Sequence, residues 1–203
     1  MTEPRDTTVS KISLRQDLGL GVLLATAGAI GVIAAVVLLI EKMNVLANPD
    51  YIPSCNLNPV LSCGSVMSTP QAEAFGIPNP IIGIVGFAIV AAIGSGLLAG
   101  ARYAPWFWGA TQVGVTFAVG FVHWLMYQSL YVIGALCPYC MVVWAVTIPI
   151  FWYVTVRNLR AFGTPKRLVT AVTEYRGAVL TGWYLIVLAL IAQRFWGYWT
   201  SLI

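Results

Sequence analysis

Residues 103–156 read YAPWFWGATQVGVTFAVGFVHWLMYQSLYVIGALCPYCMVVWAVTIPIFWYVTV, without a single aspartate, glutamate, lysine or arginine. The stretch is far too long for one transmembrane helix, which needs roughly 20 apolar residues. The chain must therefore turn back once inside it. Proline suits the first turn of a helix better than its interior. The break is therefore predicted at Gly134–Pro138, between helices near Trp106–Leu130 and Cys137–Val156.

The rest of the chain has the same character. It has 203 residues, of which 59% are apolar and 9% are charged, whereas a soluble domain has about 25% charged residues. Two more uncharged runs are long enough to span a membrane: Leu18–Ile40 with 23 residues and Ile81–Gly100 with 20. A fifth apolar segment runs from about Gly177 to Tyr198. The sequence predicts an all-α integral membrane protein with five spans.

The basic residues predict which side of the membrane each loop occupies. Lysine and arginine favour the cytoplasmic side. One side collects the basic residues of the N-terminal tail and of the connections after spans two and four: Arg5, Lys11, Arg15, Arg102, Arg157, Arg160, Lys166, Arg167 and Arg176. The other side has only Lys42 and Arg194. The N-terminus is therefore predicted to be cytoplasmic. The net charge of +4 reflects this topology, and no basic face or motif indicates nucleic-acid binding.

These features predict an organisation in four parts. Residues 1–17 form a cytoplasmic tail, and the first apolar run is too long for the core of a cleaved signal peptide. Residues 18–157 form a four-helix bundle, whose outer loop (41–79) carries one cysteine pair. Residues 158–176 form a basic cytoplasmic connector, and residues 177–203 form the fifth transmembrane helix.

The four cysteines form two pairs on one predicted side of the membrane. Cys55 and Cys63 follow the first span, and Cys137 and Cys140 open the fourth. Successive spans reverse direction, so both pairs lie outside, where direct sulfur contact would allow thiol–disulfide exchange. The positive end of a helix stabilises a thiolate at its first residue. Cys137 is therefore predicted to be the reactive, exposed thiol. Cys140, one turn deeper, is expected to face the bundle interior.

Other roles for these cysteines fit less well. A Cys-x-x-Cys bridge closes a very small loop and stabilises a fold little. Zinc sites usually space their ligands by two to four residues, which Cys55 and Cys63 exceed, and a c-type haem needs histidine where position 141 is methionine. Considered alone, the Cys55/Cys63 pair is best explained as a structural disulfide. The presence of both pairs favours a redox role.

The order of these features resembles the vitamin K epoxide reductase family. A span is followed by a Cys-x7-Cys loop, two spans, and Cys-x-x-Cys at the start of span four. Residues 55–69 (CNLNPVLSCGSVMST) match the family's shuttle loop, including the hydroxyl of Thr69. Residues 75–83 (FGIPNPIIG) match its entry to span two, where Asn79 stands for a quinone-contacting asparagine. The resemblance covers roughly Leu18–Val156. An unrelated class of quinone-linked disulfide oxidases has the two motifs in reverse order.

The resemblance implies a four-helix bundle around a quinone, capped by the outer loop, with the fifth helix added. It implies catalysis by Cys55, Cys63, Cys137 and Cys140. The cofactor would be menaquinone or ubiquinone, with no metal, and its contacts would come from the following residues: Met67, Thr69, Asn79, Cys140 and Trp144. The family often has tyrosine at the position of Trp144.

The resemblance also implies the cellular setting. Many bacterial relatives continue into a thioredoxin-like domain, whereas this chain ends at Ile203. A stand-alone form would therefore work with a separate, DsbA-like protein of the thioredoxin fold. The predicted location is a bacterial inner membrane, in contact with lipid, and the predicted function is the transfer of electrons from that secreted or periplasmic partner to the quinone.

Two other functions are weighed against this one. The same residues would serve reduction of a quinone epoxide, and the chain could be a non-enzymatic membrane component with two structural disulfides. No intramembrane acidic and basic pair marks a transport path.

Further residues of the spans have two readings each. His123 could relay protons or be a neutral histidine bonded to a neighbouring helix, and Gln128 and Tyr131 could line the pocket or only pack between helices. Several glycines are expected to permit close helix contact: Gly28, Gly31, Gly83, Gly86, Gly94, Gly114 and Gly120.

Overall fold

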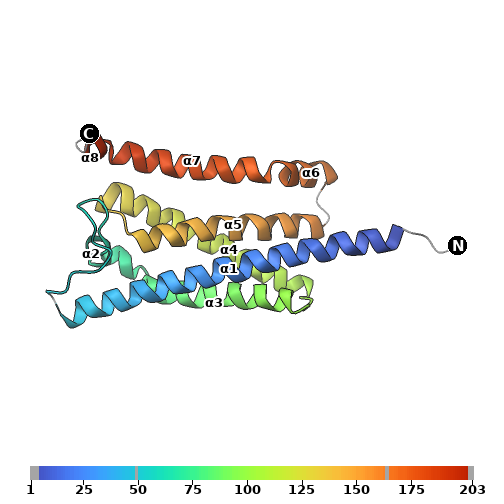
Figure 1. Cartoon of the computed structure of the whole chain (residues 1–203), viewed down its shortest axis with the longest axis horizontal. Helices are drawn as coiled ribbons and strands as arrows, with labels where there is room; N and C mark the ends of the chain where they lie inside the picture. The colour runs from blue at the N-terminus through green and yellow to red at the C-terminus, as the bar shows by residue number, and fades with distance from the viewer. Residues whose placement is uncertain (1–4, 49, 163–164, 201–203) are drawn as a thin grey trace.

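The computed structural model describes residues 5–48, 50–162 and 165–200. Figure 1 shows five long helices side by side: α1 (Arg5–Ala47), α3 (Asn79–Leu98), α4 (Pro105–Tyr127), α5 (Pro138–Ala161) and α7 (Arg176–Arg194). Each of the five includes a segment long and apolar enough to cross a membrane. The predicted all-α, multi-pass membrane fold is therefore confirmed.

Shorter helical segments join the spans. The outer loop contains α2 (Cys63–Met67) and the 3-10 helix η1 (Pro70–Glu73), and α4 continues as a π-helical segment, η2 (Gln128–Ile133). Two further helices, α6 (Lys166–Glu174) and α8 (Trp196–Thr200), flank α7. α6 lies within the predicted connector.

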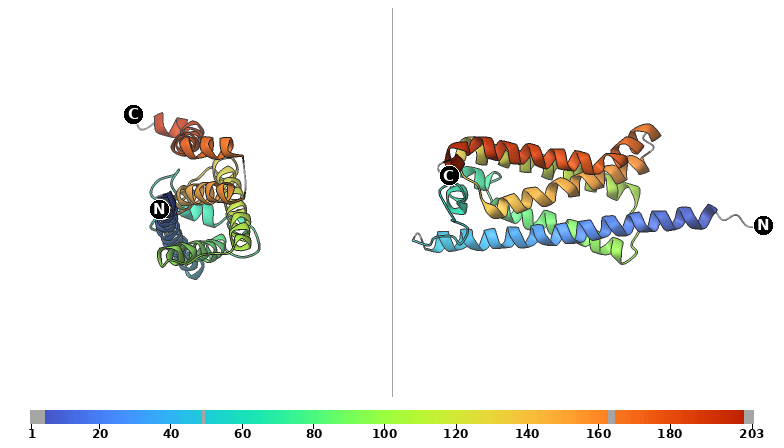
Figure 2. Two further views of the ribbon diagram at one scale, coloured as in Figure 1. Left: turned by 90° about the vertical axis from the view of Figure 1, so that its right-hand side faces the viewer. Right: turned by 45° about the horizontal axis from the view of Figure 1, so that its top comes forward.

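Four of the long helices form the bundle, and the fifth lies against its outside. Viewed end-on, α1, α3, α4 and α5 surround a common centre, whereas α7 stands apart (Figure 2). α1 packs extensively against α3 and also against α5, and α4 packs against α5. Packing between α3 and α4 is sparse. α7 touches mainly α5 and η2.

Glycine explains why α1 and α3 approach so closely. A Cβ atom at Gly28 would lie 2.6 Å from the backbone nitrogen of Ala91, and one at Gly94 would lie on the backbone of Ala25. Only a residue without a side chain fits at such crossings. The prediction of close contact is therefore correct at these two glycines.

The other glycines predicted to permit close contact divide into those that have a close neighbour and those that do not. Gly31 faces Phe87, and Gly83 faces Ala35, across the α1–α3 interface. The prediction is wrong for the rest, whose added Cβ atoms would meet no atom within 4 Å: Gly86, Gly114 and Gly120. Gly86 and Gly114 instead line a cavity inside the bundle.

α1 extends beyond the predicted end of span one at Ile40. Glu41 and Lys42 are buried, because the outer loop supplies partners for both charges. The Glu41 carboxylate accepts hydrogen bonds from the hydroxyls of Ser54 and Tyr51, and Lys42 pairs with Glu73. A charged residue usually ends an apolar span, but here the loop lets the helix continue to Ala47.

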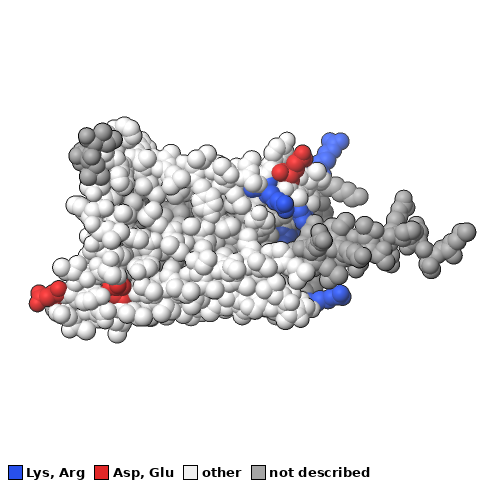
Figure 3. All heavy atoms as spheres, viewed as in Figure 1, with Lys and Arg blue, Asp and Glu red and all other residues white. Residues whose placement is uncertain are grey.

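Charge is distributed unevenly along the bundle. On the face shown in Figure 3, the basic side chains gather at the end that carries α6, where acidic ones also lie, and the coloured side chains at the end of the outer loop are acidic. Basic residues at one end agree with the pattern from which a cytoplasmic N-terminus is predicted. The orientation itself stays a prediction.

Candidate functional site

The outer loop is fastened to the start of α5 by backbone hydrogen bonds. The N–H of Leu136 donates to the carbonyl of Val60 at 2.7 Å, and the N–H of Ser62 donates to the carbonyl of Leu136 at 2.8 Å. The two segments form a parallel β-bridge. Ser62 and Leu136 each directly precede a cysteine, so the bridge brings Cys63 beside Cys137.

The sulfur atoms meet at this bridge. The Sγ atoms of Cys63 and Cys137 lie 3.1 Å apart. Cys63 is bonded to Cys55 in a disulfide, whereas Cys137 and Cys140 are free thiols. Thiol–disulfide exchange requires direct contact between the attacking sulfur and one sulfur of the disulfide. The structure therefore brings the two pairs into position for exchange.

Asparagine side chains shape the loop that carries the disulfide. The Asn58 side-chain oxygen accepts hydrogen bonds from the backbone N–H groups of Val60 and Leu61, at 2.9 and 2.8 Å. The Asn56 side-chain oxygen accepts from the N–H of Gly64 at 2.9 Å and from the hydroxyl of Ser62 at 3.2 Å. Such local bonds hold a turn in place without regular secondary structure.

The sulfur atoms are hidden from solvent. Cys137 and Cys63 are 0% exposed and Cys55 is 5% exposed. The prediction that Cys137 is an exposed thiol is therefore wrong, because the outer loop covers the start of α5. Cys140 is only partly buried.

The surroundings of Cys137 favour its thiolate. Cys137 is the N-cap residue of α5 and lies just outside the span. The pKa of Cys137 is lowered by a hydrogen bond from the Cys140 thiol and by the backbone N–H groups of Cys140 and Tyr139, and burial opposes this shift. A thiolate is the nucleophilic form of cysteine.

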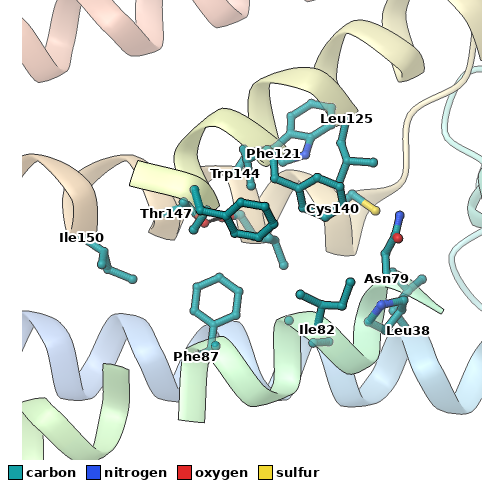
Figure 4. A pocket seen from close by; sticks show the side chains of 18 of the residues that line it. Leu38, Asn79, Ile82, Phe87, Phe121, Leu125, Cys140, Trp144, Thr147 and Ile150 are labelled. Atoms are coloured by element: carbon teal, nitrogen blue, oxygen red, sulfur yellow. Dashed lines mark hydrogen bonds between the residues drawn. The ribbon is translucent and has the colours of Figure 1, made fainter. Parts of the chain in front are cut away.

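A cavity of about 490 Å³ lies inside the bundle, between α1, α3, α4 and α5 and beneath the outer loop. Its wall is mostly apolar (Figure 4). The residues predicted to contact a quinone all line it: Met67, Thr69, Asn79, Cys140 and Trp144. The other three cysteines are not among its lining residues. Cys140 therefore connects the thiol pair with the cavity.

The bonds of Asn79 orient its amide. One side-chain N–H donates to the carbonyl of Gln71 at 2.7 Å, and the side-chain oxygen accepts from the N–H of Ala74 at 3.1 Å. These two partners fix which end of the amide is nitrogen. In the reverse assignment the amide oxygen would face the Gln71 carbonyl, and the amide N–H groups would face the N–H of Ala74. An amide nitrogen has two N–H groups, so the second remains for a ligand.

Thr69 and Met67 contribute differently. The hydroxyl of Thr69 donates to the carbonyl of Val66 at 2.8 Å. Its proton is therefore engaged, and its oxygen is left as an acceptor toward the cavity. Met67 is buried at the end of α2 and supplies apolar surface.

Lys42 is a cavity residue that the sequence analysis did not select. Among the described residues that line the cavity, it is the sole charged side chain. Its signal in the sequence is its position four residues after Leu38, on the same face of α1. Both residues line the cavity.

His123 lies elsewhere. It lines a second cavity, of about 600 Å³, between the bundle and α7, together with Tyr131. The Nε2 atom of His123 accepts a hydrogen bond from the indole N–H of Trp183 at 3.0 Å, and its Nδ1 atom lies 2.7 Å from the carbonyl of Val119. This is the neutral histidine bonded to a neighbouring helix. Gln128, by contrast, lines the first cavity.

The first cavity suits a molecule that is uncharged and largely apolar. It offers apolar walls, a few polar groups and a cysteine thiol, and these features fit a quinone. In the described ranges, no three histidine, cysteine or acidic residues gather as metal ligands.

The chain matches a known protein family. A family model described as "Vitamin K epoxide reductase family" matches residues 22–155, from α1 through most of α5. The matched region contains all four cysteines and the lining residues of the first cavity. No curated protein matches the chain.

Proposed function

The chain belongs to the vitamin K epoxide reductase family, and from this premise we propose that it oxidises the dithiol of a thioredoxin-fold partner outside the cytoplasm and passes two electrons to a membrane quinone. Membership supports a quinone-linked thiol oxidoreductase. The observation that carries the finer proposal is the 3.1 Å contact between Cys63 and Cys137, with Cys140 on the cavity wall.

Electrons enter at the outer pair. A partner thiolate attacks Cys55 and opens the Cys55–Cys63 disulfide, and the partner then completes its own disulfide. Since Cys55 is 5% exposed, the loop must move for this step. The freed Cys63 attacks Cys137 of an oxidised Cys137–Cys140 pair and releases Cys140. Cys55 then attacks Cys63, which restores the outer disulfide.

The structure has the redox state that follows these exchanges. The Cys55–Cys63 disulfide is formed, and Cys137 and Cys140 are free. Cys140 is the thiol that reaches the cavity, so it is the electron donor, and closure of the Cys137–Cys140 disulfide completes the cycle. Each turnover moves two electrons, and every 30 mV of potential difference contributes about 1.4 kcal/mol.

The cavity residues prepare the electron transfer. A quinone, when bound, would supply the electron acceptor. The second N–H of Asn79 would donate to a quinone oxygen and stabilise the negative charge that develops there. The hydroxyl oxygen of Thr69, whose own proton is engaged, would accept a hydrogen bond only from a hydroxyl of the reduced product, and Met67 and Trp144 would offer the ring apolar surface. The apolar wall excludes water and strengthens these interactions.

The setting follows from the same argument. The protein is a multi-pass membrane protein. We place its N-terminus in the cytoplasm and the sulfur atoms at the outer face of a bacterial inner membrane, where disulfides persist. The partner is a DsbA-like protein, and the quinone is menaquinone or ubiquinone.

The first experiment tests the relay with purified protein in lipid nanodiscs. A reduced thioredoxin-fold protein and a short-chain ubiquinone are supplied, and both partner oxidation and quinone reduction are followed. Cys137→Ala is expected to abolish quinone-dependent oxidation, whereas Ser65→Ala, an outer-loop control, is expected to keep it. Unchanged oxidation with Cys137→Ala would refute the relay. Faster turnover with quinone epoxide than with quinone would favour epoxide reduction.

A second experiment identifies the partner. In Cys63→Ala, Cys55 is a free thiol that attacks the disulfide of an oxidised partner, and the resulting mixed disulfide is preserved by acid quenching and alkylation of free thiols. Mass spectrometry of the disulfide-linked product is expected to identify a thioredoxin-fold protein. A product linked through Cys140 instead would contradict the proposed entry point.

A further inference from the structure

Lys42 joins the inner cavity to the outer solvent through an ion pair. Its Nζ atom lies 2.6 Å from a carboxylate oxygen of Glu73. The Lys42 side chain is 7% exposed and lines the cavity, whereas the Glu73 side chain is 47% exposed. One member of the pair is therefore inside the protein and the other meets water.

The ion pair lies at the end of the cavity that holds the reactive groups. Glu73 belongs to η1, the same short helix whose Gln71 carbonyl accepts the amide hydrogen bond of Asn79. Figure 4 shows Leu38, Asn79 and the sulfur of Cys140 at one end of the cavity. Lys42 follows Leu38 by one turn of α1, toward the outer loop.

Reduction of a quinone to a hydroquinone takes two electrons and two protons. The thiolate is the reactive form of cysteine, and the N-cap position of Cys137 favours it, so the pair reacts as one thiolate and one thiol. Such a pair supplies two electrons and one proton when its disulfide closes. The second proton must come from another group.

We propose that Lys42 donates this second proton to the bound quinone and that Glu73 returns a proton to Lys42 from the outer solvent, an assignment that rests on the proposed function. The Cys137–Cys140 bond forms, the thiolate and thiol lose two electrons and one proton, and the Lys42 ammonium becomes a neutral amine. The quinone gains two electrons and two protons. Charge is balanced, because one anion and one cation are consumed together.

The residue types suit these roles. The Lys42 ammonium carries three N–H groups and lines the cavity that would hold the quinone, so it can donate directly to an oxygen there. Its positive charge also stabilises negative charge on the quinone oxygen before the proton moves. A carboxylate at the protein surface exchanges protons rapidly with water, which a buried amine cannot do alone.

Conservative variants distinguish proton donation by Lys42 from a purely structural role, in which the Lys42–Glu73 ion pair only holds η1 against α1. Lys42→Arg keeps the positive charge and the pairing with Glu73, but a guanidinium does not release a proton in proteins. Glu73→Gln keeps an acceptor for the ammonium but cannot carry a proton. Asp50→Asn, which removes an exposed acid at the same end of the molecule, is the matched control.

The experiment measures two steps separately in nanodiscs. Full-length protein is reduced with dithiothreitol, freed of reductant and mixed with a short-chain ubiquinone, so that single-turnover quinone reduction is observed. Steady-state turnover with dithiothreitol is measured in parallel. Reopening of the Cys55–Cys63 disulfide by dithiothreitol is followed by thiol alkylation.

Lys42→Arg is expected to slow single-turnover quinone reduction by about 100-fold or more, the usual contribution of a general acid, while disulfide reopening stays normal. Glu73→Gln is expected to keep the first turnover and to slow the steady state, because Lys42 begins protonated but is not recharged. Asp50→Asn is expected to match the wild type in all steps.

A wild-type first turnover in Lys42→Arg overturns the proposal, as does a loss shared equally by quinone reduction and disulfide reopening, which would indicate a structural role. If the wild-type protein itself reduces no quinone, the proposed function fails instead.

Discussion

Replacement of Asn79 by alanine tests how the cavity stabilises charge. The substitution removes the amide N–H that remains for a ligand, together with the bonds to the Gln71 carbonyl and the Ala74 N–H. The first loss acts on the transition state of quinone reduction. The other two act on the outer loop, because both partners belong to it.

The two effects differ in size. A donor aimed at developing negative charge contributes about 100- to 1000-fold to a rate, or about 2.7–4 kcal/mol. Each neutral hydrogen bond of the loop contributes about 0.5–1.5 kcal/mol to stability. Asn79→Ala is therefore expected to slow single-turnover quinone reduction by about 100-fold or more.

Asn56→Ala is the matched control. It also removes two loop hydrogen bonds, from Gly64 and Ser62, but Asn56 is not among the cavity's lining residues. The rate of quinone reduction by Asn56→Ala is expected to fall by no more than about threefold. Its melting temperature is expected to fall by about as much as that of Asn79→Ala. Equal rates of quinone reduction in the two variants would refute the role assigned to Asn79.

Three further outcomes are expected. Gly28→Ala should destabilise the protein by about 1–3 kcal/mol because its Cβ would overlap α3, whereas Gly120→Ala at an open helical position should not; equal melting temperatures would contradict this. The pKa of Cys137 is lowered, so the stability that its thiolate contributes is present at high pH and is lost as pH falls through that lowered pKa. Cys140→Ala removes the largest cause of the lowered pKa, so the midpoint of thiolate ultraviolet absorbance should move to higher pH. A downward shift would contradict this cause. His123→Ala should leave turnover within about twofold and lower stability, since its ring lines the other cavity; a tenfold slower turnover would restore the proton relay.

The spans could be predicted because their signal is local. Apolar length and absence of charge locate each helix, and the proline of Cys137-Pro138 marks where α5 begins. The positions of Asn79 and Cys140 on the cavity wall follow from the family resemblance and from helix periodicity. These features depend on residue type, which a sequence displays directly.

The rest depends on contacts between distant segments. The meeting of Cys63 with Cys137 is set by backbone hydrogen bonds of Leu136, and backbone groups are the same in every residue type except proline. The burial of Cys137 follows from that contact. Lys42 was interpreted only as a topology signal, because its partner Glu73 belongs to a segment that is brought back over the cavity by the fold.

The hidden disulfide has a consequence for the traffic of electrons outside the cell membrane. A sulfur that water barely touches is reached only slowly by free small thiols, so under the proposed function a dilute reducing molecule would drain the quinone pool slowly. Under the proposed function, fast entry would require a protein that binds firmly enough to displace the loop. Selectivity in such an enzyme would then depend on which proteins can displace the outer loop, while the thiol–disulfide exchange beneath the loop can remain fast.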